Sequence, residues 1–169
     1  MDGDIVLDTN ITADFLAVYF QNNVSTNGVF DARYNLNVNI VKRINEILSE
    51  FRFGEGIFEK GIVVASSFAF VEIARQFEEI ADNRFSLEQF RAFIDSPPDW
   101  FLIETVSVDL FHLFNDVPEK VVFDQNNHVP IEWADAIHIV TTLSRGNQSV
   151  LCTTDGRILR IPSLKERFI

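Results

Sequence analysis

The chain contains a single cysteine, no apolar run long enough to cross a bilayer, and no recognisable export signal. One cysteine excludes an intrachain disulfide, which favours a reducing setting. A transmembrane helix needs about 20 consecutive apolar residues. The opening Met1-Asp2-Gly3-Asp4 has neither the basic nor the apolar part of a secretory signal. We therefore expect a soluble, cytoplasmic protein with no membrane segment.

Basic residues are also scarce. The chain has 14 lysines and arginines against 25 aspartates and glutamates, and its formal net charge is -11. Proteins that wrap long nucleic acids neutralise phosphates with clustered basic side chains. The acidic balance therefore counts against extensive nucleic-acid binding and allows only a small, salt-sensitive footprint. Residues 156–169 carry a local basic excess, which also fits an ordinary solvated terminus.

Apolar residues are abundant, at 47% of the chain, and 17 of them are phenylalanine. A chain of 169 residues has the size of one domain with a substantial core. Short apolar runs predict buried strands at 5–7, 62–65, 100–106 and 148–153. Segments of helical periodicity lie between them, at 12–20, 38–53, 68–81, 87–94, 108–115 and 131–144. This alternation predicts an α/β domain with a mainly parallel sheet covered by helices on both faces.

Local signals refine these boundaries. Thr12 is expected to cap the first helix, and Ser86-Leu87-Glu88-Gln89 has the spacing of a capping box. Gly146 is expected to end the last helix. Polar loops are expected at 21–39 and at 124–128.

Two acids directly follow predicted strands. Asp8 ends the run Ile5-Val6-Leu7 and is followed by Thr9-Asn10, while Asp155 follows the last strand and two threonines. The carboxyl ends of parallel strands are where open sheets gather their ligands, so both acids are suitably placed for chemistry. For Asp8 alone, the capping of a turn explains the residue equally well.

Two further acids lie on predicted helices. Glu72 borders an apolar helix face, although a surface ion pair with Arg75 would also account for it. Asp135 shares one stripe of an otherwise apolar helix with Glu132, His138 and Thr142. A buried carboxylate needs a partner, and a divalent cation supplies one, whereas a helix-dipole interaction is the alternative. His138 is interpreted as a hydrogen-bonded core histidine.

Taken together, the four acids predict a metal site. Four neighbouring carboxylates repel one another unless a cation compensates them. Oxygen ligands without a cysteine or histidine cluster favour Mg²⁺ or Mn²⁺ over zinc. Such ions activate bound water for attack on phosphate esters.

These residues resemble the PIN domain, the metal-dependent ribonuclease module of VapC-type toxins. Four segments carry the resemblance in the family's order: Val6-Leu7-Asp8-Thr9-Asn10, Ser67-Phe68-Ala69-Phe70-Val71-Glu72-Ile73, Ala134-Asp135-Ala136-Ile137-His138 and Thr153-Thr154-Asp155. The resemblance spans nearly the whole chain and implies a PIN-like α/β/α sandwich with a mainly parallel sheet of four to five strands. It implies one domain over residues 1–169, with an inserted loop and helix around 21–56.

The resemblance also implies a function. Asp8, Glu72, Asp135 and Asp155 would be the catalytic and metal-binding residues for Mg²⁺ or Mn²⁺, with Asn10 and Thr153 supporting the site. Arg75, Arg157 and Arg160 are the candidates for binding substrate phosphates. The implied activity is endonucleolytic hydrolysis of RNA, in a homodimer that is the toxin of a toxin–antitoxin pair and is bound by an antitoxin protein.

Three alternatives stay open at this point. The chain could be an RNA-processing PIN nuclease without an antitoxin, or a catalytically silent PIN-like binding module. Asp8-Thr9-Asn10-Ile11-Thr12 is also similar to the nucleophile motif of haloacid-dehalogenase-like phosphatases. That motif has a second acid where this chain has Asn10, so the phosphatase ranks below the nuclease.

Overall fold

The four predicted strands form one parallel sheet in the computed structural model, which describes residues 3–24, 42–48, 61–81, 84–116, 121–124 and 127–160. The strands are β1 (Ile5–Leu7), β2 (Val63–Ser66), β3 (Phe101–Glu104) and β6 (Val150–Cys152), in the order β3-β2-β1-β6. Every neighbouring pair is parallel. β1, β2 and β6 are buried along their whole length, as continuous apolar runs require. The predicted α/β sandwich with a parallel sheet is confirmed.

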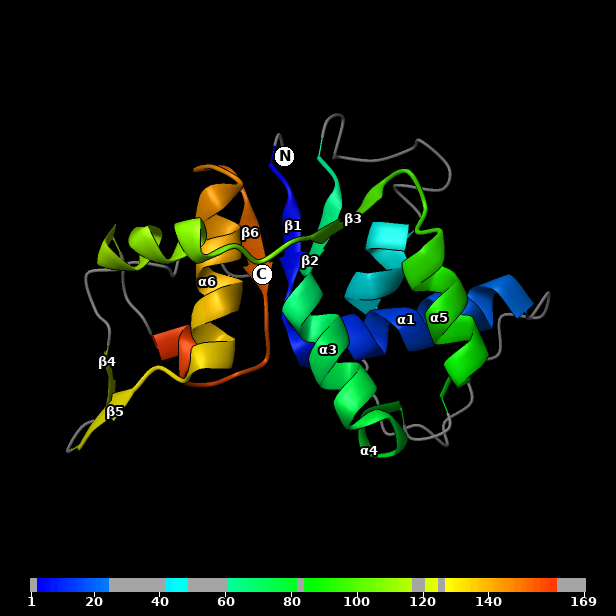
Figure 1. Ribbon diagram of the computed structural model, residues 1–169, viewed down its shortest axis with the longest axis horizontal. Coiled ribbons are helices and arrows are strands. Elements are labelled where there is room, and N and C mark those ends of the chain that lie inside the picture. Colours follow the sequence, from blue (N-terminus) through cyan, green and yellow to red (C-terminus); the bar gives the residue numbers. More distant parts are fainter. Residues whose placement is uncertain are drawn as a thin grey trace.

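Alternate residues of the central strands face opposite sides of the sheet. Ile5 and Leu7 belong to one buried cluster, and Val6 belongs to a second. The first cluster is covered by α1 (Thr9–Val24), α3 (Ser67–Arg75) and α5 (Leu87–Asp95). The second is covered by α6 (Trp133–Ser144). Figure 1 shows α6 on one side of the strands and the other three helices on the opposite side.

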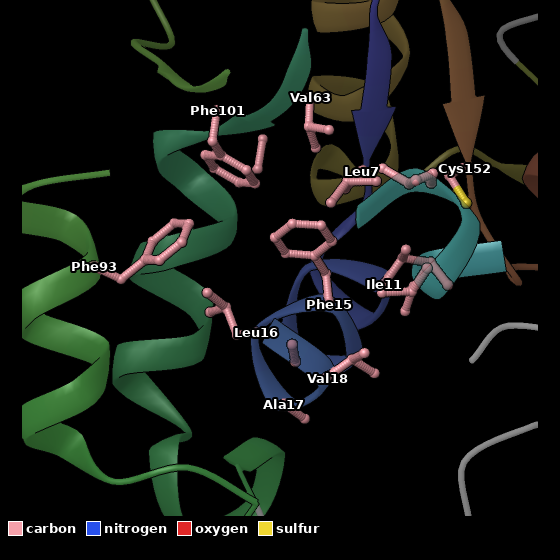
Figure 2. Packing of buried hydrophobic residues seen from close by; sticks show 14 of the residues in the cluster. Leu7, Ile11, Phe15, Leu16, Ala17, Val18, Val63, Phe93, Phe101 and Cys152 are labelled. Carbon is pink, nitrogen blue, oxygen red and sulfur yellow. The ribbon is translucent and has the colours of Figure 1, made fainter. Parts of the chain in front are cut away.

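Aromatic rings dominate the larger cluster. Phe15 of α1 is fully buried, and its ring centroid lies 5.3 Å from that of Phe101 and 6.1 Å from that of Trp100. Figure 2 shows the Phe15 ring projecting from its helix toward the strand residues Leu7 and Val63. These aromatic contacts hold α1 against the sheet, and α1 is the helix that follows Asp8.

The helices agree with the sequence in position but differ in detail. Ser86 forms the expected capping box at the start of α5. The helix predicted over 68–81 is instead two helices, α3 and α4 (Phe77–Ala81), because the chain leaves the helix at Gln76. α1 begins at Thr9 and runs to Val24, so residues 21–24 are helical where a loop was predicted. Residues 42–48 are helical as expected, whereas the rest of the predicted insertion lies outside the described residues.

A small hairpin replaces the loop predicted at 124–128. β4 (Val121–Asp124) pairs antiparallel with β5 (Asn127–Pro130), separately from the main sheet. It follows a 3-10 helix, η2 (Val108–Asp116), and a second one, η3 (Ile158–Arg160), follows β6. Within the described ranges, we find no helix with the length and apolar character needed to span a membrane.

Candidate active site at the carboxyl edge of the sheet

The register of the parallel strands gathers polar residues at one edge. Leu7 is aligned with Ala65 of β2 and with Cys152 of β6, so the residues that follow these strands emerge together. The backbone N–H of Asp8 donates to the carbonyl of Cys152 at 3.2 Å, which continues the pairing one residue past the strands. Asp8 and Thr153 are thereby brought side by side although they are far apart in the sequence.

All four predicted acids line one cavity of about 600 Å³ at this edge. Asp8 comes from the end of β1, Glu72 from α3, Asp135 from the first turn of α6, and Asp155 from the segment after β6. Asn10 of α1 lines the same cavity. Five polar residues predicted from separate sequence segments therefore open into one space.

Asp8 has two roles. Its Oδ1 accepts a hydrogen bond from the backbone N–H of Ile11 at 2.7 Å, so Asp8 caps α1. The prediction that Thr12 is the cap was wrong, because Thr12 lies inside the helix and donates its hydroxyl to the carbonyl of Asp8. The Thr153 side chain also hydrogen-bonds the Asp8 carboxylate. Burial nevertheless raises the pKa of Asp8 above its usual 3.8, and the charge of Asp155 adds to the effect.

Asp155 is held by Arg157. The carboxylate accepts hydrogen bonds from the backbone N–H of Arg157 at 2.7 Å, from Nε at 3.2 Å and from Nη2 at 2.9 Å. The side-chain hydrogen bond with Arg157 lowers the pKa of Asp155, so this acid is charged at neutral pH. The same guanidinium pairs with Glu132, and its Nη2 lies 3.2 Å from Oδ2 of Asp135.

Asp135 is a buried acid with a raised pKa. It is 8% exposed, and burial raises its pKa to about 6, with a further contribution from the charge of Asp155. Oδ2 of Asp135 is buried, and although Nη2 of Arg157 lies 3.2 Å away as an ion-pair partner, this oxygen accepts no hydrogen bond. A buried carboxylate oxygen without a hydrogen bond is costly and is a recognised mark of functional sites.

Glu72 is positioned by a side-chain relay. Its Oε2 accepts a hydrogen bond from the hydroxyl of Thr9 at 2.5 Å, and Nε2 of His138 lies 3.1 Å from the same hydroxyl oxygen. Because the hydroxyl has one proton and gives it to Glu72, His138 must carry its proton on Nε2 and donate it to Thr9. Burial lowers the pKa of His138 to about 4, so the ring is neutral at pH 7. The alternative of a surface pair between Glu72 and Arg75 does not describe this arrangement.

The donor set fits a hard divalent cation in its chemistry. Carboxylate and hydroxyl oxygens face one cavity, and Oδ2 of Asp135 has no hydrogen-bond donor of its own. Asp135 and Asp155 flank one nitrogen of Arg157, but the four acids are not gathered into one set of ligands. In the part of the chain that the structure describes, no three histidine, cysteine, aspartate or glutamate side chains lie close enough to hold one ion. Arg157 stands between two of the acids instead.

The remaining predicted residues are distributed differently. Arg157 lines the cavity, whereas Arg75 is exposed on α3 and is not among the lining residues. The side chain of Arg160 lies outside the described residues.

The sequence analysis overlooked other polar residues of the cavity, among them Thr9, Asp14, Gln76, Glu79 and Arg84. Arg84 pairs with Asp14 and donates to the carbonyls of Ile80 and Ala81, which connects α4 to α1 in the cavity lining. A helical period from Asp8 and Asn10 would have indicated Asp14, but nothing local indicates the others.

No protein-family model, no curated protein and no solved structure matches this chain.

Proposed function

We propose that this protein is a Mg²⁺- or Mn²⁺-dependent endoribonuclease that hydrolyses RNA phosphodiester bonds. The observation that carries the proposal is the position of Asp8, Glu72, Asp135 and Asp155 around one cavity at the carboxyl edge of a parallel sheet. Carboxylates that line one cavity repel one another, and a cation bound between them would compensate this repulsion.

The resemblance to the PIN domain supports the same proposal. The segments that carry the resemblance follow β1, open α3, open α6 and follow β6, and each contributes one acid to the cavity. The α/β sandwich with a parallel sheet is the architecture that the resemblance implies.

The chain's own residues have distinct tasks in this mechanism. A divalent cation held by the four acids would lower the pKa of a bound water and stabilise charge on the phosphate. Thr9 and His138 hold Glu72 in one orientation, and Thr153 does the same for Asp8. Hydrolysis adds the water oxygen to phosphorus, breaks the bond from phosphorus to the leaving oxygen, and transfers the water proton to that oxygen.

The substrate follows from the cavity and its charge. A cavity of about 600 Å³ has room for a short stretch of single strand. Among the described residues that line the cavity, the positively charged side chains are Arg84 and Arg157, and both are paired with acids. Recognition then depends on few phosphate contacts, with an affinity that falls as salt rises. An antitoxin protein and a second copy of this chain are the partners that the resemblance adds to the proposal.

A catalytically silent PIN-like binding module is the second candidate function. The observation in its favour is that Arg157 already compensates part of the negative charge of Asp135 and Asp155 without a metal. It predicts the same fold without metal-dependent turnover.

Cleavage of single-stranded and transfer RNA separates the two candidates. The natural chain is assayed with Mg²⁺, with Mn²⁺ and with a chelator, beside Asp8→Asn. Asparagine caps a helix as well as aspartate does, so this variant keeps the start of α1 and loses only the charge. We expect metal-dependent cleavage by the natural chain and its loss in Asp8→Asn. Equal cleavage by both proteins rejects the assigned site, and no cleavage by either favours the silent module.

A further inference from the structure

We propose that Arg157 is a built-in counter-ion of the carboxylate cluster, and that its guanidinium and a divalent cation exclude one another at Asp135 and Asp155. The inference rests on the proposed metal-dependent function and extends it. In the metal-free protein, the guanidinium of Arg157 would lie where the cation binds.

The first support is the geometry of the guanidinium. One nitrogen, Nη2, lies 2.9 Å from Oδ2 of Asp155 and 3.2 Å from Oδ2 of Asp135. Those two carboxylates come from different elements, the segment after β6 and the first turn of α6. A positive group that reaches both acids takes up the oxygens that would serve as metal ligands.

The second support is that this neutralisation is incomplete. A guanidinium needs its N–H bonds in line with an acceptor, and Oδ2 of Asp135 receives no such bond although it is buried. Arg157 also faces three acids at once, Glu132, Asp135 and Asp155, with a single positive charge. A divalent cation carries twice that charge and has no such directional requirement, so it would satisfy the oxygen that the guanidinium leaves without a bond.

The third support is that the guanidinium of Arg157 is more exposed to solvent than the carboxylate of Asp135. Its side chain is 34% exposed, whereas that of Asp135 is 12% exposed, so the guanidinium lies at the open side of the pair. The carboxylate is fixed at the start of a buried helix, and the arginine follows a short turn with Gly156. Displacement of Arg157 therefore requires a side-chain movement and no rearrangement of the core.

The exchange explains two features of the site together. It accounts for the lack, among the described residues, of three acids already gathered for an ion, since Arg157 stands between two of them. It also supplies a phosphate-binding group at the moment when a metal is present, because the displaced guanidinium remains tethered at the cavity that it lines. Metal binding and RNA binding would then favour one another.

Titration of the metal-free protein with Mn²⁺, followed by electron paramagnetic resonance of the free ion, tests the exclusion directly. The variants are Arg157→Met, which keeps the length and removes the charge, and Arg157→Lys, which keeps the charge without the fork. Arg91→Met is the matched control, because Arg91 is exposed on α5 and its loss changes the net charge by the same amount. Circular dichroism establishes that each variant is folded.

If Arg157 competes with the cation, Arg157→Met should bind Mn²⁺ at least fivefold more tightly than the natural chain, within the range of about 5- to 150-fold that coupled sites show. Arg157→Lys should fall in between, and Arg91→Met should stay within twofold of the natural chain. The inference is overturned if the natural chain binds Mn²⁺ and Arg157→Met binds it no more tightly, or if neither binds it. Tighter binding by Arg157→Met without RNA cleavage by any variant supports the inference and rejects the nuclease.

Discussion

Replacing Asp135 by asparagine is expected to stabilise the metal-free protein. Asp135 is buried at the start of α6 beside the charge of Asp155, and these surroundings raise its pKa from 3.8 to about 6 despite the nearby Arg157. The folded protein therefore resists ionising this carboxyl. Asparagine has nearly the same shape and no charge, so the variant removes the penalty and leaves the packing of α6 intact.

The magnitude follows from the pKa. Each pKa unit corresponds to 1.36 kcal/mol, so ionising Asp135 costs about 3 kcal/mol more in the folded protein than in the unfolded chain. At pH 8, where the penalty is complete, Asp135→Asn should raise the free energy of unfolding by up to about 3 kcal/mol. For a domain of this size, that gain corresponds to an increase of roughly 6 to 12 °C in the melting temperature.

The gain depends on pH with a defined sign. Asp135 binds its proton more tightly in the folded protein, with a pKa of about 6, than in the unfolded chain, with a pKa of 3.8. Lowering the pH from 7 towards 4 neutralises the carboxyl first in the folded state, so the penalty fades across that window. The stability difference between Asp135→Asn and the natural chain should shrink accordingly and vanish below pH 3.8.

Urea denaturation in a chelating buffer at pH 8 and at pH 5 measures this difference. Asp99→Asn provides the control, since Asp99 is exposed in the turn before β3 and carries the same charge. Asp99→Asn should change the free energy of unfolding by less than about 0.5 kcal/mol at both pH values. An Asp135→Asn protein that is less stable than the natural chain at pH 8, or a gain that does not diminish at pH 5, would refute the reasoning.

Three further expectations concern other parts of the molecule. Thr9→Val should weaken Mn²⁺ binding about 10- to 100-fold in a calorimetric titration, whereas Thr9→Ser should bind Mn²⁺ nearly as tightly as the natural chain. Equal losses of affinity in both variants would contradict the role of the Thr9 hydroxyl. Phe15→Ala should lower the free energy of unfolding by about 3 to 5 kcal/mol in urea, because the ring is fully buried among other aromatics, and a loss under 1 kcal/mol would dispute that packing. Gly146→Ala should lower the free energy of unfolding by about 1 to 2 kcal/mol, because alanine is strained at a φ of 97°. A methyl group at this position meets no atom within 4 Å, so steric clash adds nothing. An unchanged melting temperature would contradict this expectation.

The sequence predicted the features that depend on local pattern. Runs such as Ile5-Val6-Leu7 identify buried strands because a strand covered on both faces must be apolar at every position. Ser86 and Gln89 identify the start of α5 because both partners of the capping box lie within one turn. The sequence also predicted that acids at strand ends lie near one another, since parallel strands share one carboxyl edge.

Features that depend on distant partners escaped prediction. The break at Gln76 involves neither glycine nor proline, and helical periodicity continues through it. The contact between Thr9 and His138 joins residues 129 positions apart, so no spacing rule indicates it. Arg157 was predicted as a phosphate ligand, but its ion pair with Asp135 depends on the packing of α6 against the sheet. Partners of charged side chains are set by tertiary packing, which local patterns do not encode.

The central claim is that the four acids come together around a divalent cation, and crystals grown with Mn²⁺ test it most directly. Anomalous scattering should reveal manganese inside the cavity, with its coordination shell supplied by Asp8, Glu72, Asp135 and Asp155, directly or through bound water, and with Arg157 withdrawn from Asp135 and Asp155. Manganese bound elsewhere on the protein, or a cavity in which Arg157 still pairs with both acids at saturating Mn²⁺, would contradict the account.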